Sequence, residues 1–128
     1  IAIMKIKLFI YIIVFFSLGL NSLFAIDPEI FVQSTVNRAS KVLSEDISKE
    51  KKMLELKNIA KDTVDINGIG FYTLGAIRKN LDNEQKNKYS NLFEKYFLKS
   101  FSSRLAEYTN PEIDVLGKEI LNKNYTMV

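Results

Sequence analysis

Residues 91–101 have the sequence NLFEKYFLKSF and lie inside a longer segment, residues 82–108, that decides the fold. Asp82 followed by Gln85 is typical of a helix start, because each side chain can accept a hydrogen bond from the other residue's free backbone N–H. Apolar residues then recur three or four positions apart for roughly five turns, which is the spacing of one helix face. We therefore predict a long helix whose wide apolar face touches two neighbours. That face consists of Tyr89, Leu92, Phe93, Tyr96, Phe97, Phe101, Leu105 and Tyr108.

Shorter helices are expected before the long one. The tripeptide DPE at residues 27–29 combines a capping side chain, a proline at the first turn and an acidic residue near the positive helix end. The apolar spacing that follows predicts a helix that ends near Ser44. Residues 45–52 are rich in charge and predict a connection to a second helix, whose apolar positions fall within residues 53–60. Asp65 can cap a third, short helix.

The third helix carries Gly68, Gly70 and Gly75, although glycine is a poor helix former. Glycine lacks the side chain that would block a neighbouring group, so this cluster predicts the close approach of another backbone or of a ligand. The glycines do not follow a strand, and their spacing does not fit a nucleotide-binding loop. Gly75 is expected at a tight helix end or at a helix–helix contact.

The pattern changes after Pro111. Apolar and acidic residues alternate over residues 112–115, which predicts a short strand, and residues 125–128 predict the beginning of a second one. Two short strands make a poor sheet on their own. We therefore expect this chain to be the front part of a larger, C-terminally incomplete domain.

The charge does not favour a nucleic-acid partner. The net charge is +3, but Lys5 and Lys7 account for two of the 18 basic residues, which leaves 16 against 15 acidic ones. No basic stripe with interleaved aromatic residues remains after the first 25 residues. A nucleic-acid-binding function is therefore not expected.

The chain contains no cysteine and no histidine. Disulfides, thiolate chemistry, zinc sites built from Cys or His, and histidine-based acid–base catalysis are thereby excluded from it. Asp62 and Asp65 fit a helix end and the next helix cap better than a metal or acid–base site. The sequence predicts neither an enzyme nor a metal or cofactor.

The N-terminus has the three-part pattern of a secretory signal. Met4–Lys7 is a short positive start, and residues 8–20 are an apolar run. A short polar stretch then leads to Ala25. We predict a signal peptide over residues 1–25, counted from Met4, with cleavage after Ala25 and one mature domain at residues 26–128.

An uncleaved membrane anchor is the alternative. Residues 8–26 just reach the ~18 apolar residues that a spanning helix needs. Asn21 and Ser22 interrupt this apolar run, so export with cleavage is favoured.

A set of residues with fixed spacing extends from the first helix to the end of the long one. Its members are Asp27-Pro28, Phe31-Val32, Asp65, Ile66, Ile69, Leu74-Gly75, Gln85, Phe93, Phe97, Phe101, Leu105 and Tyr108. Because these residues occur in this order and at this spacing, residues 27–128 resemble the MlaC family, which is also called the toluene-tolerance or Ttg-type family of periplasmic proteins. An aromatic residue that family members carry near the position of Ile77 or Arg78 is absent here.

The resemblance implies an α+β fold, NTF2-like or cystatin-like, in which N-terminal helices pack on a curved antiparallel sheet around a deep apolar cavity. Most of that sheet would be missing from the present chain. The implied function is that of a periplasmic phospholipid carrier. The acyl chains would lie inside and the head group at the mouth, with the bound phospholipid as cargo rather than as a cofactor.

The resemblance also implies partners. These are an inner-membrane ABC transporter complex with its substrate-binding membrane subunit, and an outer-membrane lipoprotein–porin complex. The processes that it implies are intermembrane lipid transport, outer-membrane lipid asymmetry and solvent tolerance.

The long helix and the glycine-rich one supply the expected lipid-binding residues. By periodicity alone the aromatic stripe fits an ordinary core face, and the resemblance adds the interpretation of a cavity wall. Two alternatives stay open: a periplasmic helical module that binds another protein, and a membrane-anchored accessory subunit that keeps its N-terminal helix. The expected lipid-binding residues are Ile69, Tyr72, Leu74, Phe93, Phe97, Phe101, Leu105 and Tyr108.

Overall fold

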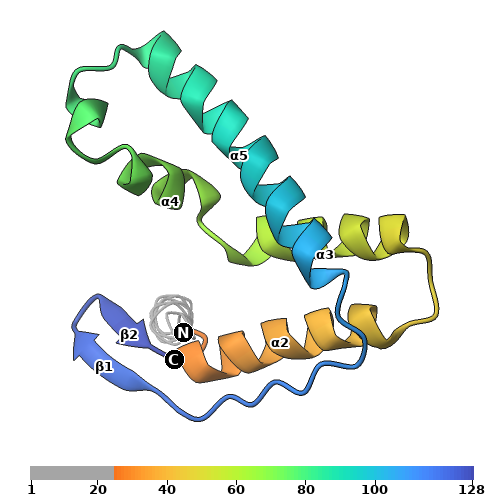
Figure 1. Ribbon diagram of the computed structural model, residues 1–128. Helices are drawn as coiled ribbons and strands as arrows, with labels where there is room; N and C mark the ends of the chain where they lie inside the picture. The colour runs from red at the N-terminus through yellow and green to blue at the C-terminus, as the bar shows by residue number, and fades with distance from the viewer. Residues whose placement is uncertain (1–24) are drawn as a thin grey trace, which may run out of the picture.

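The structure, a computed structural model, describes residues 25–128. The predicted signal peptide lies outside the described residues except for Ala25. None of the helices in the described part is long and apolar enough to cross a membrane. In chain order the elements are α2 (Pro28–Ser44), α3 (Lys49–Thr63), α4 (Ile66–Thr73), the 3-10 helix η1 (Gly75–Lys79), α5 (Asn83–Leu105), β1 (Glu119–Asn122) and β2 (Tyr125–Met127) (Figure 1).

Each of the four α-helices within residues 25–128 begins at a side chain that accepts a hydrogen bond from a backbone N–H of the first turn. Asp27 and Asp65 do so at 2.9 Å, and Asp82 does so at 2.8 Å as part of a full capping box with Gln85. These three predicted helix starts are confirmed. Ser48 caps α3 in the same way, so this helix begins inside the stretch predicted as a connection. Such caps contribute typically about 1 kcal/mol each.

The buried core consists of two small clusters that share α3. In the first, α3 packs against the end of α2 and the end of α5. In the second, the next turn of α3 packs against α4 and the middle of α5. The side chain of Ser102 is fully buried on α5 between them. The buried apolar members are Leu43, Leu56 and Ala106 in the first cluster and Ala60, Ile66 and Leu98 in the second.

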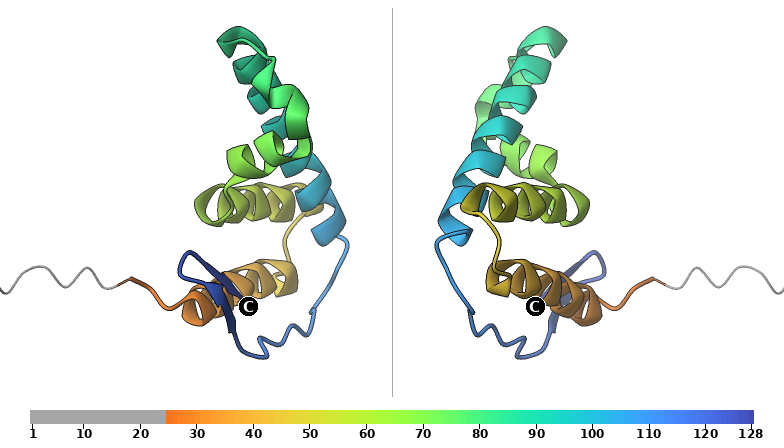
Figure 2. Two further views of the ribbon diagram at one scale, coloured as in Figure 1. Left: turned by 90° about the vertical axis from the view of Figure 1, so that its left-hand side faces the viewer. Right: turned by 90° about the vertical axis from the view of Figure 1, so that its right-hand side faces the viewer.

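A bend at Gly75 connects α4 to η1. Gly75 has a φ of 56°, in the left-handed region that favours glycine. A Cβ at this position would have no atom within 4 Å, so the helix-end prediction is confirmed and the helix–helix alternative is not what the structure has. Figure 2 shows that α4, η1 and the first half of α5 extend away from α2 and the strands.

The two strands form an antiparallel hairpin in which Glu119 pairs with Met127 and Ile120 with Thr126. The second predicted strand is confirmed. The strand predicted at residues 112–115 is wrong, because those residues are irregular and mostly exposed, with no neighbouring strand to pair with among the described residues. In the described part of the chain, four α-helices with a small antiparallel sheet confirm the α+β class.

An ion pair ties the start of the hairpin to the start of α2. Lys118 Nζ donates to Asp27 Oδ2, across 91 residues of chain, and we refer to this pair as the clasp. Figure 1 shows the hairpin beside the N-terminal end of α2. The hydrogen bond from Lys118, followed by that from the Glu29 backbone, holds the pKa of Asp27 below its ordinary value. Residue 27 therefore serves both as a helix cap and as one half of the clasp.

We expect Leu56→Ala to lower the free energy of unfolding by about 2–5 kcal/mol, because it opens a cavity where α2, α3 and α5 meet. Leu56 is 0% exposed. Urea denaturation measures the change. Leu54→Ala is the matched control, because Leu54 lies on the same helix and is 57% exposed. Equal losses for the two variants would contradict the assignment of the core.

We expect acid to release the hairpin from α2. The folded pKa of Asp27 is lowered, so the clasp stabilises fully above the ordinary aspartate pKa of about 4 and is lost as the pH falls through the lower folded value. Amide chemical shifts of the hairpin, followed by NMR during an acid titration, report the release. Lys118→Gln should move the midpoint toward the ordinary value, and an unchanged midpoint would contradict the clasp.

Candidate functional site

Four aromatic rings on successive turns of α5 form a stacked row, which we call the aromatic ladder. Tyr89, Phe93, Phe97 and Phe101 lie four positions apart, so their side chains share one face of the helix. The ring centroids are separated by 5.9, 6.1 and 5.7 Å in order along the helix. The interplanar angles of 24°, 27° and 9° correspond to stacked rings. The ladder is thus a continuous apolar wall along most of α5.

The ladder rests against α4 at one glycine. A Cβ on Gly70 would lie 2.8 Å from Cδ1 of Phe93, so only a glycine permits this contact without movement of the ring. The predicted close approach at the glycine cluster therefore involves an aromatic side chain. Phe93, Phe97 and Phe101 also pack against the second buried cluster, and all three remain half-buried.

Hydroxyl groups fasten α4 to the first half of α5. Thr73 Oγ1 lies 2.7 Å from the hydroxyl of Tyr89, and Ser90 donates to Oδ1 of Asn67. Together with the Gly70 contact, these bonds fix the register between the two helices. The ladder therefore has a fixed position relative to α4.

The other predicted site residues lie in four different places. Gly70 and Thr73 mark the side of α4 that faces α5. Ile69 and Tyr72 point away from that side, and their side chains are 40% and 80% exposed, respectively. Leu74 is half-buried at the end of α4. Leu105 packs against the first buried cluster, and Tyr108 lies beyond the end of α5, exposed. The structure thus stacks Phe93, Phe97 and Phe101 in one row. Leu105 follows Phe101 by four positions at the end of the same helix, and the remaining four residues are not part of the row.

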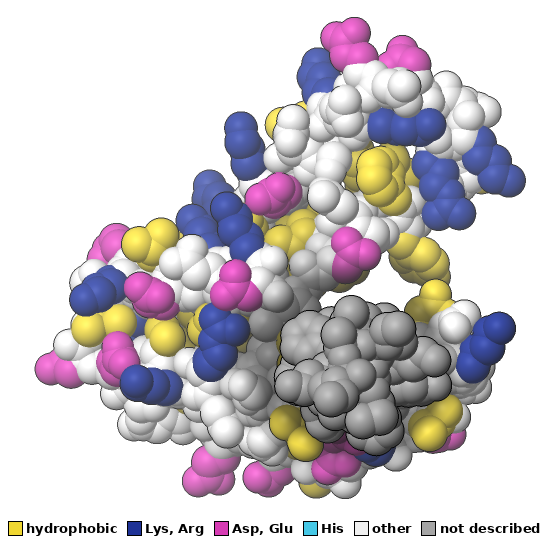
Figure 3. All heavy atoms as spheres, turned by 180° about the vertical axis from the view of Figure 1, so that it is seen from behind, with side chains coloured by type: hydrophobic (Ala, Val, Ile, Leu, Met, Phe, Trp, Pro, Cys, Tyr) yellow, Lys and Arg dark blue, Asp and Glu magenta, His cyan; other side chains and the backbone are white. Residues whose placement is uncertain are grey.

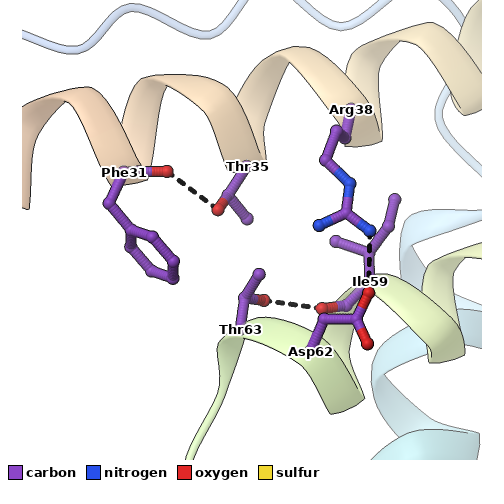
Figure 4. A network of polar contacts seen from close by, with 6 residues as sticks. All are labelled: Phe31, Thr35, Arg38, Ile59, Asp62 and Thr63. Carbon is purple, nitrogen blue, oxygen red and sulfur yellow. Dashed lines mark hydrogen bonds and ion pairs between the residues drawn. The ribbon is translucent and has the colours of Figure 1, made fainter. Parts of the chain in front are cut away.

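The surface between α2 and α3 adds an apolar feature that sequence reasoning did not assign to the site. Figure 4 shows Phe31 and Thr35 of α2 opposite Thr63 of α3. Thr35 donates to the carbonyl of Phe31 at 2.9 Å, and Thr63 donates to the carbonyl of Ile59 at 2.6 Å. Because both hydroxyls are bonded within their own helices, the threonine methyl groups face the space between the helices. The signal in the sequence was the four-residue spacing of Phe31 and Thr35.

An ion pair closes one end of this space. Arg38 Nη2 lies 2.9 Å from Oδ2 of Asp62, so it joins α2 to α3 next to the two threonines (Figure 4). Both side chains are well exposed, and pairs of this kind contribute at most about 1 kcal/mol. The pair therefore contributes little to the stability of the α2–α3 contact.

The site offers apolar contact rather than reactive groups. No group of metal-ligating side chains is present within residues 25–128. A surface hollow of about 470 Å³ on α2 is lined by other residues than the predicted ones, namely Ile30, Gln33, Ser34, Asn37, Arg38 and Lys41. What the ladder, the exposed side of α4 and the Phe31 surface have in common is exposed or half-buried hydrocarbon.

A comparison with protein families gives a match. The family model described as MlaC protein matches residues 33–128, which include every predicted site residue. No curated protein and no solved structure matches the chain significantly.

We expect Gly70→Ala to destabilise the protein by about 1–3 kcal/mol, because the new methyl group collides with the ring of Phe93. Alanine otherwise stabilises a helix by up to about 1 kcal/mol relative to glycine. Thermal or urea unfolding measures the loss. A double-mutant cycle supplies the control: in a Phe93→Ala background the same substitution should become neutral or stabilising. An equal loss in both backgrounds would show that the contact is not the cause.

Proposed function

The chain belongs to the MlaC protein family, and from this premise we propose that it carries phospholipid through the periplasm as the soluble component of the Mla lipid-transport system. In this proposal the signal peptide directs export and is removed after Ala25. The carrier takes lipid from one membrane complex and delivers it to another. No covalent chemistry is required of the protein.

The observation that supports the proposal best is the aromatic ladder. It is a wall of four rings that is packed on α4 on one side and not fully buried. Each acyl methylene that leaves water for such a surface contributes about 0.8 kcal/mol, so a diacyl lipid needs no directed polar contact for high affinity.

Two further surfaces suit the same ligand. Ile69 and Tyr72 expose apolar area on α4, and Phe31 lies beside two threonines whose hydroxyls are already bonded. Because these hydroxyls have partners, an apolar chain can cover them without the cost of an unsatisfied buried polar group. We propose that acyl chains contact the ladder and the α4 surface while the head group stays in water.

The proposed partners follow from the family. They are an inner-membrane ABC transporter complex with its substrate-binding membrane subunit and an outer-membrane lipoprotein–porin complex. Transfer between them supports outer-membrane lipid asymmetry and tolerance to solvents. Apolar contacts impose little orientation on a bound lipid. This suits a carrier, because the lipid must also be released at its destination.

A protein-interaction module is the second candidate, and the hairpin favours it. Ile120 and Tyr125 are largely exposed, and the two strands pair only with each other among the described residues. An apolar hairpin with free edges can add a strand from another chain. Bound lipid distinguishes the two candidates.

Native mass spectrometry of the protein exported into a periplasm, without detergent, is the test. A folded chain that starts at Ile26 and carries about one diacyl phospholipid would establish the carrier. A folded chain without lipid would favour the interaction module. A mass that includes the N-terminal apolar segment would identify a membrane-anchored subunit instead.

We expect Phe97→Asp to abolish lipid retention, because a carboxylate in the middle of the ladder loses its hydration when an acyl chain covers it. Tyr72→Asp tests the α4 surface without a folding penalty, since Tyr72 is exposed, and it should reduce the bound lipid. Leu54→Asp, on an exposed position of α3, is the matched control and should retain lipid. The readout is phospholipid bound per folded protein, with helicity measured by circular dichroism. Normal lipid in folded Phe97→Asp protein would remove the ladder from the binding site.

A further inference from the structure

The predicted apolar face of α5 divides into two parts in the structure. The ladder packs against α4, whereas Leu92 and Tyr96 are 58% and 70% exposed on the neighbouring flank. These two side chains have no role in the buried clusters. Large apolar residues that a helix exposes side by side are more informative than single ones, because contiguous apolar area usually marks an interaction surface.

Three lysines flank this exposed pair. At 100° per residue, Lys88, Lys95 and Lys99 fall with Leu92 and Tyr96 within about a third of the helix circumference. All three lysines are exposed. We refer to these five residues as the basic ridge, a local group of lysines around an aromatic residue that the charge pattern of the sequence did not predict. Figure 3 shows Lys and Arg side chains on the part of the molecule built by α4, η1 and α5 as well as on the rest of the visible face.

The lysines of the ridge form no ion pair in the part of the chain that the structure describes. None of its lysines lies within salt-bridge distance of a carboxylate among residues 25–128, and no acidic residue precedes Asp27. Glu84 lies four positions before Lys88 on the same helix but forms no ion pair with it. Glu94 is on the other flank, where its Oε1 lies 3.8 Å from Nζ of Lys61. The ridge therefore combines unpaired positive charge with exposed hydrocarbon.

This combination fits the surface of an anionic bilayer better than that of a protein. Lysine is depleted at protein–protein interfaces, whereas lysines attract anionic lipids at about 1 kcal/mol each near a membrane. Tyrosine favours the membrane–water interface, since its ring is apolar and its hydroxyl stays hydrated. We propose that the basic ridge of α5 binds the charged surface of an anionic phospholipid bilayer.

Bilayer binding goes beyond the proposed lipid carriage, because a protein can dock on a membrane without extracting lipid from it. The ridge and the ladder lie on adjacent flanks of one helix. A molecule docked through the ridge holds the ladder next to the membrane surface, which shortens the path of an acyl chain between bilayer and protein.

Vesicle flotation of the mature protein tests the proposal. The wild type should bind vesicles of phosphatidylcholine that contain about one third phosphatidylglycerol, and high salt should abolish this binding. It should bind vesicles of phosphatidylcholine alone only weakly. Lys95→Gln/Lys99→Gln should bind the anionic vesicles about 25-fold more weakly, at roughly fivefold per lysine. Tyr96→Ser should weaken binding while its salt dependence remains.

Lys51→Gln/Lys57→Gln on α3 is the matched control, because it removes the same charge from a different helix. It should bind the anionic vesicles within about twofold of the wild type. The proposal is overturned if the wild type does not bind, if it ignores lipid charge, or if both double variants bind alike. Bound lipid is measured by mass spectrometry on the same samples, so loss of docking with normal cargo separates this proposal from the carrier function.

Discussion

The crossing of α5 over α3 is the contact on which the other elements depend. Both buried clusters include α3, and α5 contributes Ala106 to one and Leu98 to the other. Alanine at residues 60 and 106 and the buried Ser102 keep the side chains at the crossing small, which lets the helices approach closely. The end of α2 joins at the first cluster and α4 at the second. Apolar burial around this single crossing therefore positions the whole helical part.

The same crossing determines what α5 presents to its surroundings. Its first half extends beyond α3, so among the described elements α4 alone covers it, and α4 is too short to cover a wide apolar face. One flank becomes the ladder, held by Gly70, and the other flank exposes Leu92 and Tyr96. If other elements covered the whole apolar face of α5, that face would belong entirely to the core. Here one helix offers an apolar wall and, beside it, a charged outer surface.

The starts of the helices could be predicted from local sequence signals. The pairing of strands and the covering of helix faces depend on a second element, and the local sequence predicted them less well. Asp27, Asp65 and Asp82 cap where predicted, because capping depends only on nearby backbone groups. The alternation of apolar and acidic residues at residues 112–115 predicted a strand that the structure does not have. A strand is stable only where a neighbouring strand pairs with it. For the site, periodicity predicted the ladder but not the division of the stripe. Which flank is covered depends on α4, whose position follows from the tertiary contact at Gly70.

The clasp between Asp27 and Lys118 has a consequence for the order in which the structure forms. A chain that emerges from its N-terminus presents Asp27 first, and 91 residues must follow before Lys118 is available. The residues of both buried helical clusters, in contrast, are all present once Ala106 has emerged. Closing so long a loop costs more entropy than any contact between neighbouring helices, so the clasp forms after the helical part. Residue 27 therefore caps its helix from the beginning and gains its second role only at the end of folding.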